Sequence, residues 1–403
     1  MSSNQSFQLP DLLNIISPLE LRTNPNCRFA TDASEKWIST EIRVLSETER
    51  GSLRAAKIGL LAGLCFPTCD APQLRLLVDF MTLAFYSAIT ARDDPEGRGW
   101  WDIETPNENV SPDSNAENID PESGINILAR HALFKHAVHP QITRLAKEAP
   151  AAWTERFARS VRSFRTAQEQ LLLRDHSADP KATENTESVD SYVASRRDLY
   201  GSRVVLGIAE LLEVVDFPGV LEPEGSAAGA MVLALEELQR AAFDIIAWST
   251  DVVSYTSQRG QSSHLNLHRA SPNLVAVLMK EKHLSVQGAM NVCGHMIRGA
   301  FSAFSEAEQR VLELAVHKPR EASVFARVFS SLQWSSGEDS TNAATEEQEA
   351  VVVQTQRYIR ALKDCIVGTV HWIYETELFF GKKGSEIRNF GWIFVDQAPD
   401  NDM

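Results

Sequence analysis

Cysteine, positive charge and long apolar runs are all scarce in this chain of 403 residues. Its five cysteines form an odd set without metal-ligand spacing, so we expect neither a disulfide framework nor a zinc site. The formal net charge of −15 argues against nucleic-acid binding, because phosphate contacts require clustered Lys and Arg. No apolar run is long enough to span a membrane, and the first residues lack the basic and apolar regions of a secretion signal. We therefore expect a cytoplasmic protein.

Helical periodicity dominates the sequence, whereas the strict alternation that predicts strands is nearly missing. With 43% hydrophobic residues, the chain is long enough to bury a large core. The predicted fold class is all-α. Apolar positions at helical spacing predict helices over residues 35–45, 50–64, 74–91, 125–149, 151–173, 188–215, 228–255, 272–279, 285–317 and 350–380.

The chain divides into an N-terminal strap at 1–34, a helical domain at 35–390 and a C-terminal tail at 391–403. Segments rich in acidic and small polar residues predict loops near 96–124, 174–187 and 334–349. The first of these loops directly follows the apolar helix at 74–91, a position that suits either a lid or a passive insertion.

Three polar residues recur at one spacing in the apolar stretch FDIIAWSTDVVSYTSQR. Thr250, Ser254 and Gln258 lie at i, i+4 and i+8, so they share one face of the predicted helix. This spacing is typical of a ligand or metal site, but none of the three carries the negative charge that a hard cation prefers. The alternative is a buried helix whose polar groups are satisfied by their own backbone.

A pair of carboxylates, Asp93 and Asp94, follows the apolar helix at 74–91. Carboxylates at a helix C-terminus meet the negative end of its dipole, so a bound Mg²⁺ would stabilise them there. An exposed acidic start to the next loop fits the same residues.

Arg196 lies in the segment YVASRRDLYG, next to an apolar run. A guanidinium group has a fork of donors that suits a diphosphate. An intramolecular ion pair with Asp198 or Glu210 is the competing interpretation.

Aromatic residues are frequent on the predicted core helices. Ring faces stabilise cations, although aromatic residues on helices more often serve as ordinary core. As candidates to contact a substrate we take Phe80, Phe85, Tyr86, Trp248 and Trp372.

Five stretches, taken in order, resemble fungal class I terpene synthases of the sesquiterpene group: LAGLCFP, LRLLVDFM, YVASRRDLYG, WSTDVVSYTSQRG and HWIYETELFFG. The resemblance runs from about residue 10 to residue 390. It implies a single-domain helical bundle around a central apolar cavity, an isoprenoid substrate of about sesquiterpene size and catalytic Mg²⁺. It also implies that Arg196 senses the substrate diphosphate.

The sequence departs from this family at most of the positions that carry its chemistry. The first metal motif falls on Ala88–Arg92, which contains no carboxylate. In the second motif Thr250 and Gln258 replace the family's Asn and Glu, and only Ser254 matches. At the family's C-terminal Arg-Tyr pair the chain has Leu378 and Phe379, which we count with the substrate-contacting candidates. If Mg²⁺ is a cofactor, its ligands are expected among Asp93, Asp94 and Ser254.

Three functions are compatible with this pattern. The first is an enzyme that promotes cyclisation or coupling of an isoprenoid without the standard metal-assisted ionisation; its acid would be a buried carboxyl, with Asp79, Asp244 and Asp251 as candidates. The second is a conventional synthase with relocated metal ligands. The third is an isoprenoid-binding protein without turnover. In each case the partner is a small isoprenoid molecule, and the chain is a monomer or homodimer.

Overall fold

The computed structural model describes residues 5–41, 47–90, 151–176, 188–199, 201–212, 227–259, 273–316 and 339–395, with a few isolated positions between 144 and 149. Helices predominate in this part of the chain, which confirms the all-α prediction. In chain order the elements are β1 (Gln5–Gln8), α1 (Leu12–Ile15), α2 (Cys27–Glu41), α3 (Glu47–Ala56), α4 (Ile58–Cys65), α5 (Ala71–Thr90), α8 (Ala151–His176), α10 (Val189–Leu199), α11 (Ser202–Leu212), α12 (Ala227–Arg259), α13 (Leu274–Glu281), α14 (Val286–Val316), α16 (Asp339–Glu375), α17 (Glu377–Phe380), a 3-10 turn at Gly381–Lys383, α18 (Gly384–Phe390) and β2 (Trp392–Val395).

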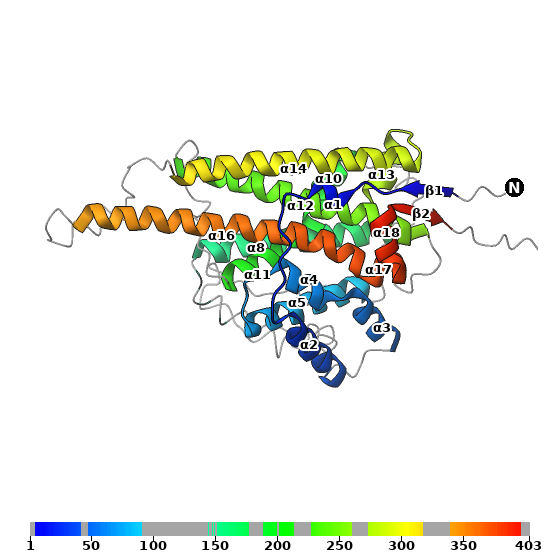
Figure 1. Cartoon of the computed structure of the whole chain (residues 1–403), viewed down its shortest axis with the longest axis horizontal. Coiled ribbons are helices and arrows are strands. Elements are labelled where there is room, and N and C mark those ends of the chain that lie inside the picture. Colours follow the sequence, from blue (N-terminus) through cyan, green and yellow to red (C-terminus); the bar gives the residue numbers. More distant parts are fainter. Residues whose placement is uncertain are drawn as a thin grey trace, which may run out of the picture.

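The long helices α12, α14 and α16 run side by side through the molecule (Figure 1). On α14 the buried residues follow at intervals of three and four, so one face of the helix enters the core. The middle of α12 is buried on nearly all sides, from Leu238 to Tyr255. Such a helix must satisfy its polar side chains within the protein.

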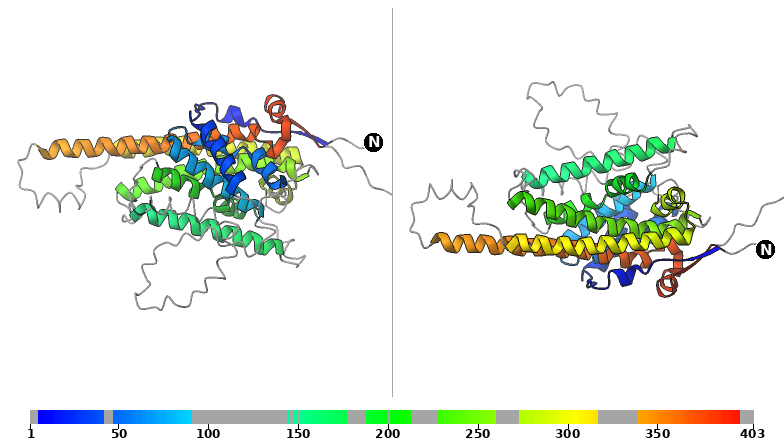
Figure 2. Two further views of the ribbon diagram at one scale, coloured as in Figure 1. Left: turned by 90° about the horizontal axis from the view of Figure 1, so that it is seen from below. Right: turned by 90° about the horizontal axis from the view of Figure 1, so that it is seen from above.

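The N-terminal helices α2, α4 and α5 pack beneath this layer, and α4 lies against α16 (Figures 1 and 2). The two helices approach each other closely at Gly368 of α16. A β-carbon added there would lie 2.7 Å from the carbonyl carbon of Leu64 and 2.9 Å from the backbone nitrogen of Cys65. Glycine therefore sets the distance between the two helices.

Replacing Gly368 by alanine should force α4 and α16 apart and lower the free energy of unfolding by about 1–3 kcal/mol. Gly299, in the middle of α14, is the matched control because a β-carbon there meets nothing within 4 Å. Gly299→Ala should raise stability by roughly 0.5–1 kcal/mol through helix propensity alone. Urea denaturation of the two variants checks both signs, and equal effects would contradict the close contact.

Two helices predicted as continuous are broken. The segment 188–215 forms α10 and α11, separated at Gly201, whose φ of 72° is one that glycine adopts readily. The segment 50–64 forms α3 and α4, separated at Lys57 with a φ of 50°. A pattern of apolar spacing continues across a break of one or two residues, so it reveals neither of these breaks.

Several predicted boundaries also differ. The helix expected at 35–45 begins at Cys27, so the strap at 1–34 includes β1, α1 and the first turns of α2. The expected loop at 334–349 is helical from Asp339, because its Ala and Glu residues favour helix once Asp and Thr begin it. The tail at 391–403 contains β2, which pairs antiparallel with β1 through Phe7 and Ile393. The loop expected at 96–124 and most of the helix expected at 125–149 lie outside the described residues, as do residues 177–187 of the loop expected at 174–187, whose first three residues belong to α8.

Each described helix is either too short or too polar to span a lipid bilayer.

Candidate functional site

The three-residue motif on α12 is held inside the protein by hydrogen bonds. The Thr250 hydroxyl donates to the Ile246 carbonyl at 2.9 Å, and the Ser254 hydroxyl donates to the Asp251 carbonyl at 3.2 Å. Ser254 also accepts a hydrogen bond from Asn273 Nδ2 at 3.1 Å. Both hydroxyls are buried, whereas the side chain of Gln258 lies outside the described residues. The motif positions that the structure describes therefore carry satisfied core groups.

Arg196 of α10 makes a buried ion pair with Asp251 of α12. Its Nε and Nη2 donate to Asp251 Oδ1 at 3.0 and 2.8 Å, and the Tyr192 hydroxyl donates to Oδ2. Arg196 is 6% exposed and Asp251 1%. Burial raises the pKa of Asp251, and Arg196 and Tyr192 oppose that rise. Arg196 thus forms an intramolecular ion pair, as the competing interpretation predicted, but the predicted partners were wrong. Asp198 pairs with Arg203, and Glu210 pairs with Arg156.

Asn273 extends this network to α13. Its Nδ2 also donates to the Asp251 carbonyl at 2.7 Å, while its Oδ1 accepts from Val275 N and caps the first turn of α13. We call Tyr192, Arg196, Asp251, Ser254 and Asn273 the α12 network. It ties three helices together at the position where the family resemblance places the second metal motif.

The other two carboxyls proposed as acids are also paired with arginines. Asp244 accepts from Arg197 Nε and Nη2 at 2.6 and 2.7 Å, and Asp79 accepts two hydrogen bonds from Arg75 Nε, at 2.9 and 2.8 Å. Burial raises the pKa of both carboxyls, and their arginine partners counteract it. Asp79 lies on α5, whereas Asp244 and Asp251 lie on α12, and each of the three carboxyls binds a different arginine.

The described aromatic candidates pack into two parts of the core. Phe80 is fully buried in the core formed by α2, α5, α8 and α11, while Trp248, Trp372 and Phe379 belong to the larger core around α12. Trp372 donates its indole N–H to the Ala56 carbonyl at 2.8 Å, and its ring lies edge-on to Phe379. Phe85 and Leu378 are partly buried against the same core. The side chain of Tyr86 lies outside the described residues.

The oxygen atoms at the motif and of Asp251 are poor ligands for Mg²⁺, which prefers several oxygen ligands including carboxylates. The motif hydroxyls donate to backbone carbonyls, and both carboxylate oxygens of Asp251 are already hydrogen-bonded. Across the described ranges, no three His, Cys, Asp or Glu side chains are grouped to hold a metal ion. Asp93 and Asp94, the other ligands considered, lie outside those ranges.

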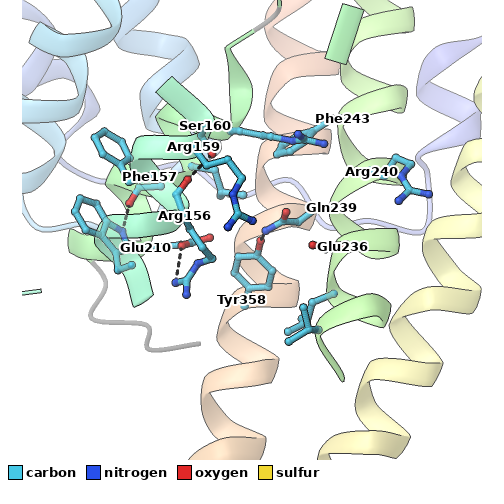
Figure 3. A pocket seen from close by; sticks show the side chains of 16 residues that line it. Arg156, Phe157, Arg159, Ser160, Glu210, Glu236, Gln239, Arg240, Phe243 and Tyr358 are labelled. Carbon is cyan, nitrogen blue, oxygen red and sulfur yellow. Dashed lines mark hydrogen bonds and ion pairs between the residues drawn. The ribbon is translucent and has the colours of Figure 1, made fainter. Parts of the chain in front are cut away.

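A separate cavity of about 270 Å³ lies between α8, α11, α12 and α16 (Figure 3). Its described lining contains none of the predicted site residues. It consists of Trp153, Arg156, Phe157, Arg159, Ser160, Arg203, Leu206, Gly207, Glu210, Val232, Leu235, Glu236, Gln239, Arg240, Phe243 and Tyr358. We call it the arginine cavity.

Glu210 occupies one wall of the arginine cavity. Its carboxylate lies 3.5 Å from Arg156 and is hydrogen-bonded to the buried Tyr358 hydroxyl, which also accepts from Gln239 Nε2. Burial raises the pKa of Glu210, and Arg156 counters it. Sequence reasoning considered Glu210 only as a partner of Arg196. The available signal was a single acidic residue in the apolar run VVLGIAELL.

The arginine cavity and the three-residue motif lie on the same face of α12. Phe243 precedes Thr250 by seven residues, close to two helical turns, and Gln239 precedes it by eleven, close to three. At about 1.5 Å per residue, Phe243 is therefore roughly 10 Å along the helix from Thr250. The cavity thus begins below the motif, toward the N-terminus of α12.

Comparisons with known proteins agree with this architecture. Residues 129–303 match the family model described as terpene synthase family 2, C-terminal metal binding. A solved hedycaryol synthase in complex with HEPES superposes with a TM-score of 0.58 and 18% identity, covering 92% of this chain and all of that one. The hedycaryol synthase structure in complex with nerolidol has a TM-score of 0.55 and 19% sequence identity, and the match covers 88% of this chain and 97% of that one. The bundle is that of a class I terpene synthase.

The sesquiterpene synthase Agr1 of Cyclocybe aegerita is 24% identical over 381 residues, which is 94% of this chain and 90% of that protein. Together with the family match, this similarity over nearly the whole chain supports the resemblance to fungal class I terpene synthases.

Proposed function

We propose that the protein binds an isoprenoid of about sesquiterpene size and promotes its cyclisation or coupling by a route that does not use a metal cluster on α12. The observation that carries this proposal is the α12 network. A metal at the motif would need oxygens that now bind backbone carbonyls, Arg196 and Tyr192. Releasing them would leave buried polar groups without partners, which is costly.

The fold and its relatives support the isoprenoid part of the proposal. The matched relative is a sesquiterpene synthase, and a structural neighbour was solved with nerolidol. Buried aromatic side chains such as Trp248 and Phe80 supply ring faces of the kind that stabilise cationic intermediates. An enclosed apolar site also protects such intermediates from water.

In this proposal the proton donor is a buried carboxyl, with Asp79, Asp244 and Asp251 as the candidates. Burial favours the neutral form of all three, which is the form that can donate a proton. Their arginine partners favour the ionised form, so a donor must exchange its ion pair when substrate binds. Asp251 has the most partners to lose, which makes Asp79 and Asp244 the better candidates.

A binding protein without turnover is the second candidate. Arg196 is the one family diphosphate contact that the sequence retains, and its two donors that bind Asp251 are directed into the core. This arrangement favours a protein that kept the fold but gave up the ionising chemistry.

Incubation with farnesyl diphosphate, in Mg²⁺ and in EDTA, tests the proposal. We expect no Mg²⁺-dependent release of diphosphate, because the α12 donors are committed within the protein. Gas chromatography of the extract and a diphosphate assay make the measurement. Hydrocarbon product that requires Mg²⁺ would instead support relocated metal ligands.

The same preparation should be incubated with farnesol and nerolidol, which carry no diphosphate. A new terpenoid product supports the enzyme, and its loss in Asp79→Asn or Asp244→Asn identifies the acid. Saturable binding without product supports the second candidate. Absence of both binding and product would count against either one.

A further inference from the structure

The arginine cavity has a charge opposite to that of the whole chain. Its described lining contains four arginines and two glutamates, which leaves two positive charges in excess among these residues, whereas the chain carries −15. We propose that this cavity is a binding site for a small polyvalent anion of the phosphate or diphosphate class. The inference does not depend on whether the protein converts an isoprenoid.

Arg156 and Arg203 are held at the cavity wall by the surrounding structure. Arg156 is mostly buried on α8 beside Glu210, and Arg203 of α11 lies over the Phe243 ring, 5.8 Å from its centroid. Arg203 is also 3.3 Å from Asp198. A guanidinium packed in this way has lost part of its freedom before a ligand arrives, and its planar fork matches two oxygens of a phosphate.

Arg159 lies at the rim of the cavity. It lies one turn after Arg156 on α8, pairs with Glu155 at 2.9 Å and has half of its side chain exposed. In Figure 3 the side chain of Arg159 extends toward Gln239 and Tyr358, while Arg156 lies beside Glu210, to which a dashed line joins it. Groups from α8, α11, α12 and α16 therefore converge on one volume.

The size of the cavity favours a small ligand. At about 270 Å³ it lies just below the roughly 300–1,000 Å³ of pockets that enclose drug-sized molecules. A phosphate or diphosphate group fits this volume, and the arginines supply the charge-assisted hydrogen bonds that such a group binds. An isoprenoid tail attached to it would have to extend beyond the described lining.

Glu210 is compatible with an anionic ligand because burial already favours its neutral form. A bound anion would add negative charge beside the carboxyl and favour proton uptake further. A protonated Glu210 no longer repels the ligand and can donate a hydrogen bond to it. Glu236 lies exposed at the rim, where solvent screens its charge.

Calorimetric titration of the full chain with inorganic diphosphate, in EDTA, tests the site. The key variant is Arg203→Gln, and Arg388→Gln is its matched control. Both arginines lie 3.3 Å from a carboxylate, and their side chains are 37% and 39% exposed, but Arg388 lies on α18, outside the cavity lining. We expect Arg203→Gln to weaken binding about tenfold or more and Arg388→Gln to leave it unchanged.

Arg159→Gln is the second variant. Because half of the Arg159 side chain is exposed, this substitution should not disturb folding, and it should also weaken the binding of diphosphate. No binding by the wild type, or equal binding by all variants, would overturn the proposal. Circular dichroism establishes that each variant is folded.

Two further titrations identify the source of the anion. If farnesyl diphosphate competes with inorganic diphosphate and Arg203→Gln weakens both, the cavity holds the head group of an isoprenyl diphosphate. If Arg203→Gln weakens the binding of inorganic diphosphate but not that of farnesyl diphosphate, the cavity is a site for the free anion. Farnesol should not compete in either case, and competition by farnesol would contradict an anion site. None of these outcomes depends on product formation, so this inference and the proposed function can fail separately.

Discussion

Replacing Arg196 by methionine is expected to lower the free energy of unfolding by about 3–5 kcal/mol, because it leaves Asp251 buried and without its cation. Asp251 is 1% exposed, so water cannot take the place of the guanidinium. Its second oxygen would still accept from Tyr192, which offsets only part of the lost interaction. Urea denaturation monitored by circular dichroism measures the change.

The double variant Arg196→Met, Asp251→Asn should recover most of this stability, because it removes both charges at once. Arg197→Met is the comparison on the neighbouring residue. Its partner Asp244 keeps two further arginines nearby, Arg240 and Arg203, which also lower its pKa. The side chain of Arg197 is also a quarter exposed. Replacing Arg197 should therefore lower the free energy of unfolding less than replacing Arg196 does.

The same variants separate two roles for Arg196. In the family resemblance this arginine senses the substrate diphosphate, whereas the structure uses it to join α10 to α12. If Arg196→Met is as stable as the wild type but loses affinity for farnesyl diphosphate, the sensing role is correct. A large loss of stability that Asp251→Asn relieves supports the structural role.

Most of the helices could be predicted from the sequence because helix patterns are local. The predicted segment 228–255 differs by a few residues from α12, and 285–317 by one residue at each end from α14. The pairing of β1 with β2 joins the two ends of the chain, and each strand has four residues. A strand that short has little alternation to detect, and its partner is set by the tertiary fold.

The candidate site was harder to predict because ion-pair partners depend on how the helices pack. Sequence reasoning sought the partner of Arg196 close to it, at Asp198 or Glu210, but Asp251 lies 55 positions away. The arginine cavity was hard to predict for the same reason, because Gln239 and Tyr358, which share a hydrogen bond, are 119 positions apart. Residue types at helical spacing indicate which side chains share a face of one helix, but not which helix faces them.

Replacing Arg156 by methionine should cost about 3–5 kcal/mol near neutral pH, because it leaves the Glu210 carboxylate buried without its cation. Burial raises the pKa of Glu210 above its ordinary value of 4.5, and Arg156 is the main group that opposes the rise. Without Arg156 this pKa should rise further. A carboxyl whose pKa is raised by folding makes its full contribution to the free energy of unfolding at low pH. This contribution is lost as the pH rises through the folded-state pKa.

The deficit of Arg156→Met should therefore be largest near pH 7 and shrink as the pH falls toward 4.5, the ordinary pKa of a glutamate, because protonation of Glu210 removes the charge that Arg156 balances. Unfolding free energies of the variant and the wild type, measured at several pH values in this range, give the comparison. Arg159→Met, one turn further along α8, removes a half-exposed ion pair and should cost no more than about 1 kcal/mol at any pH. A deficit for Arg156→Met that does not change with pH would mean that packing of the arginine side chain, rather than the charge of Glu210, sets its contribution.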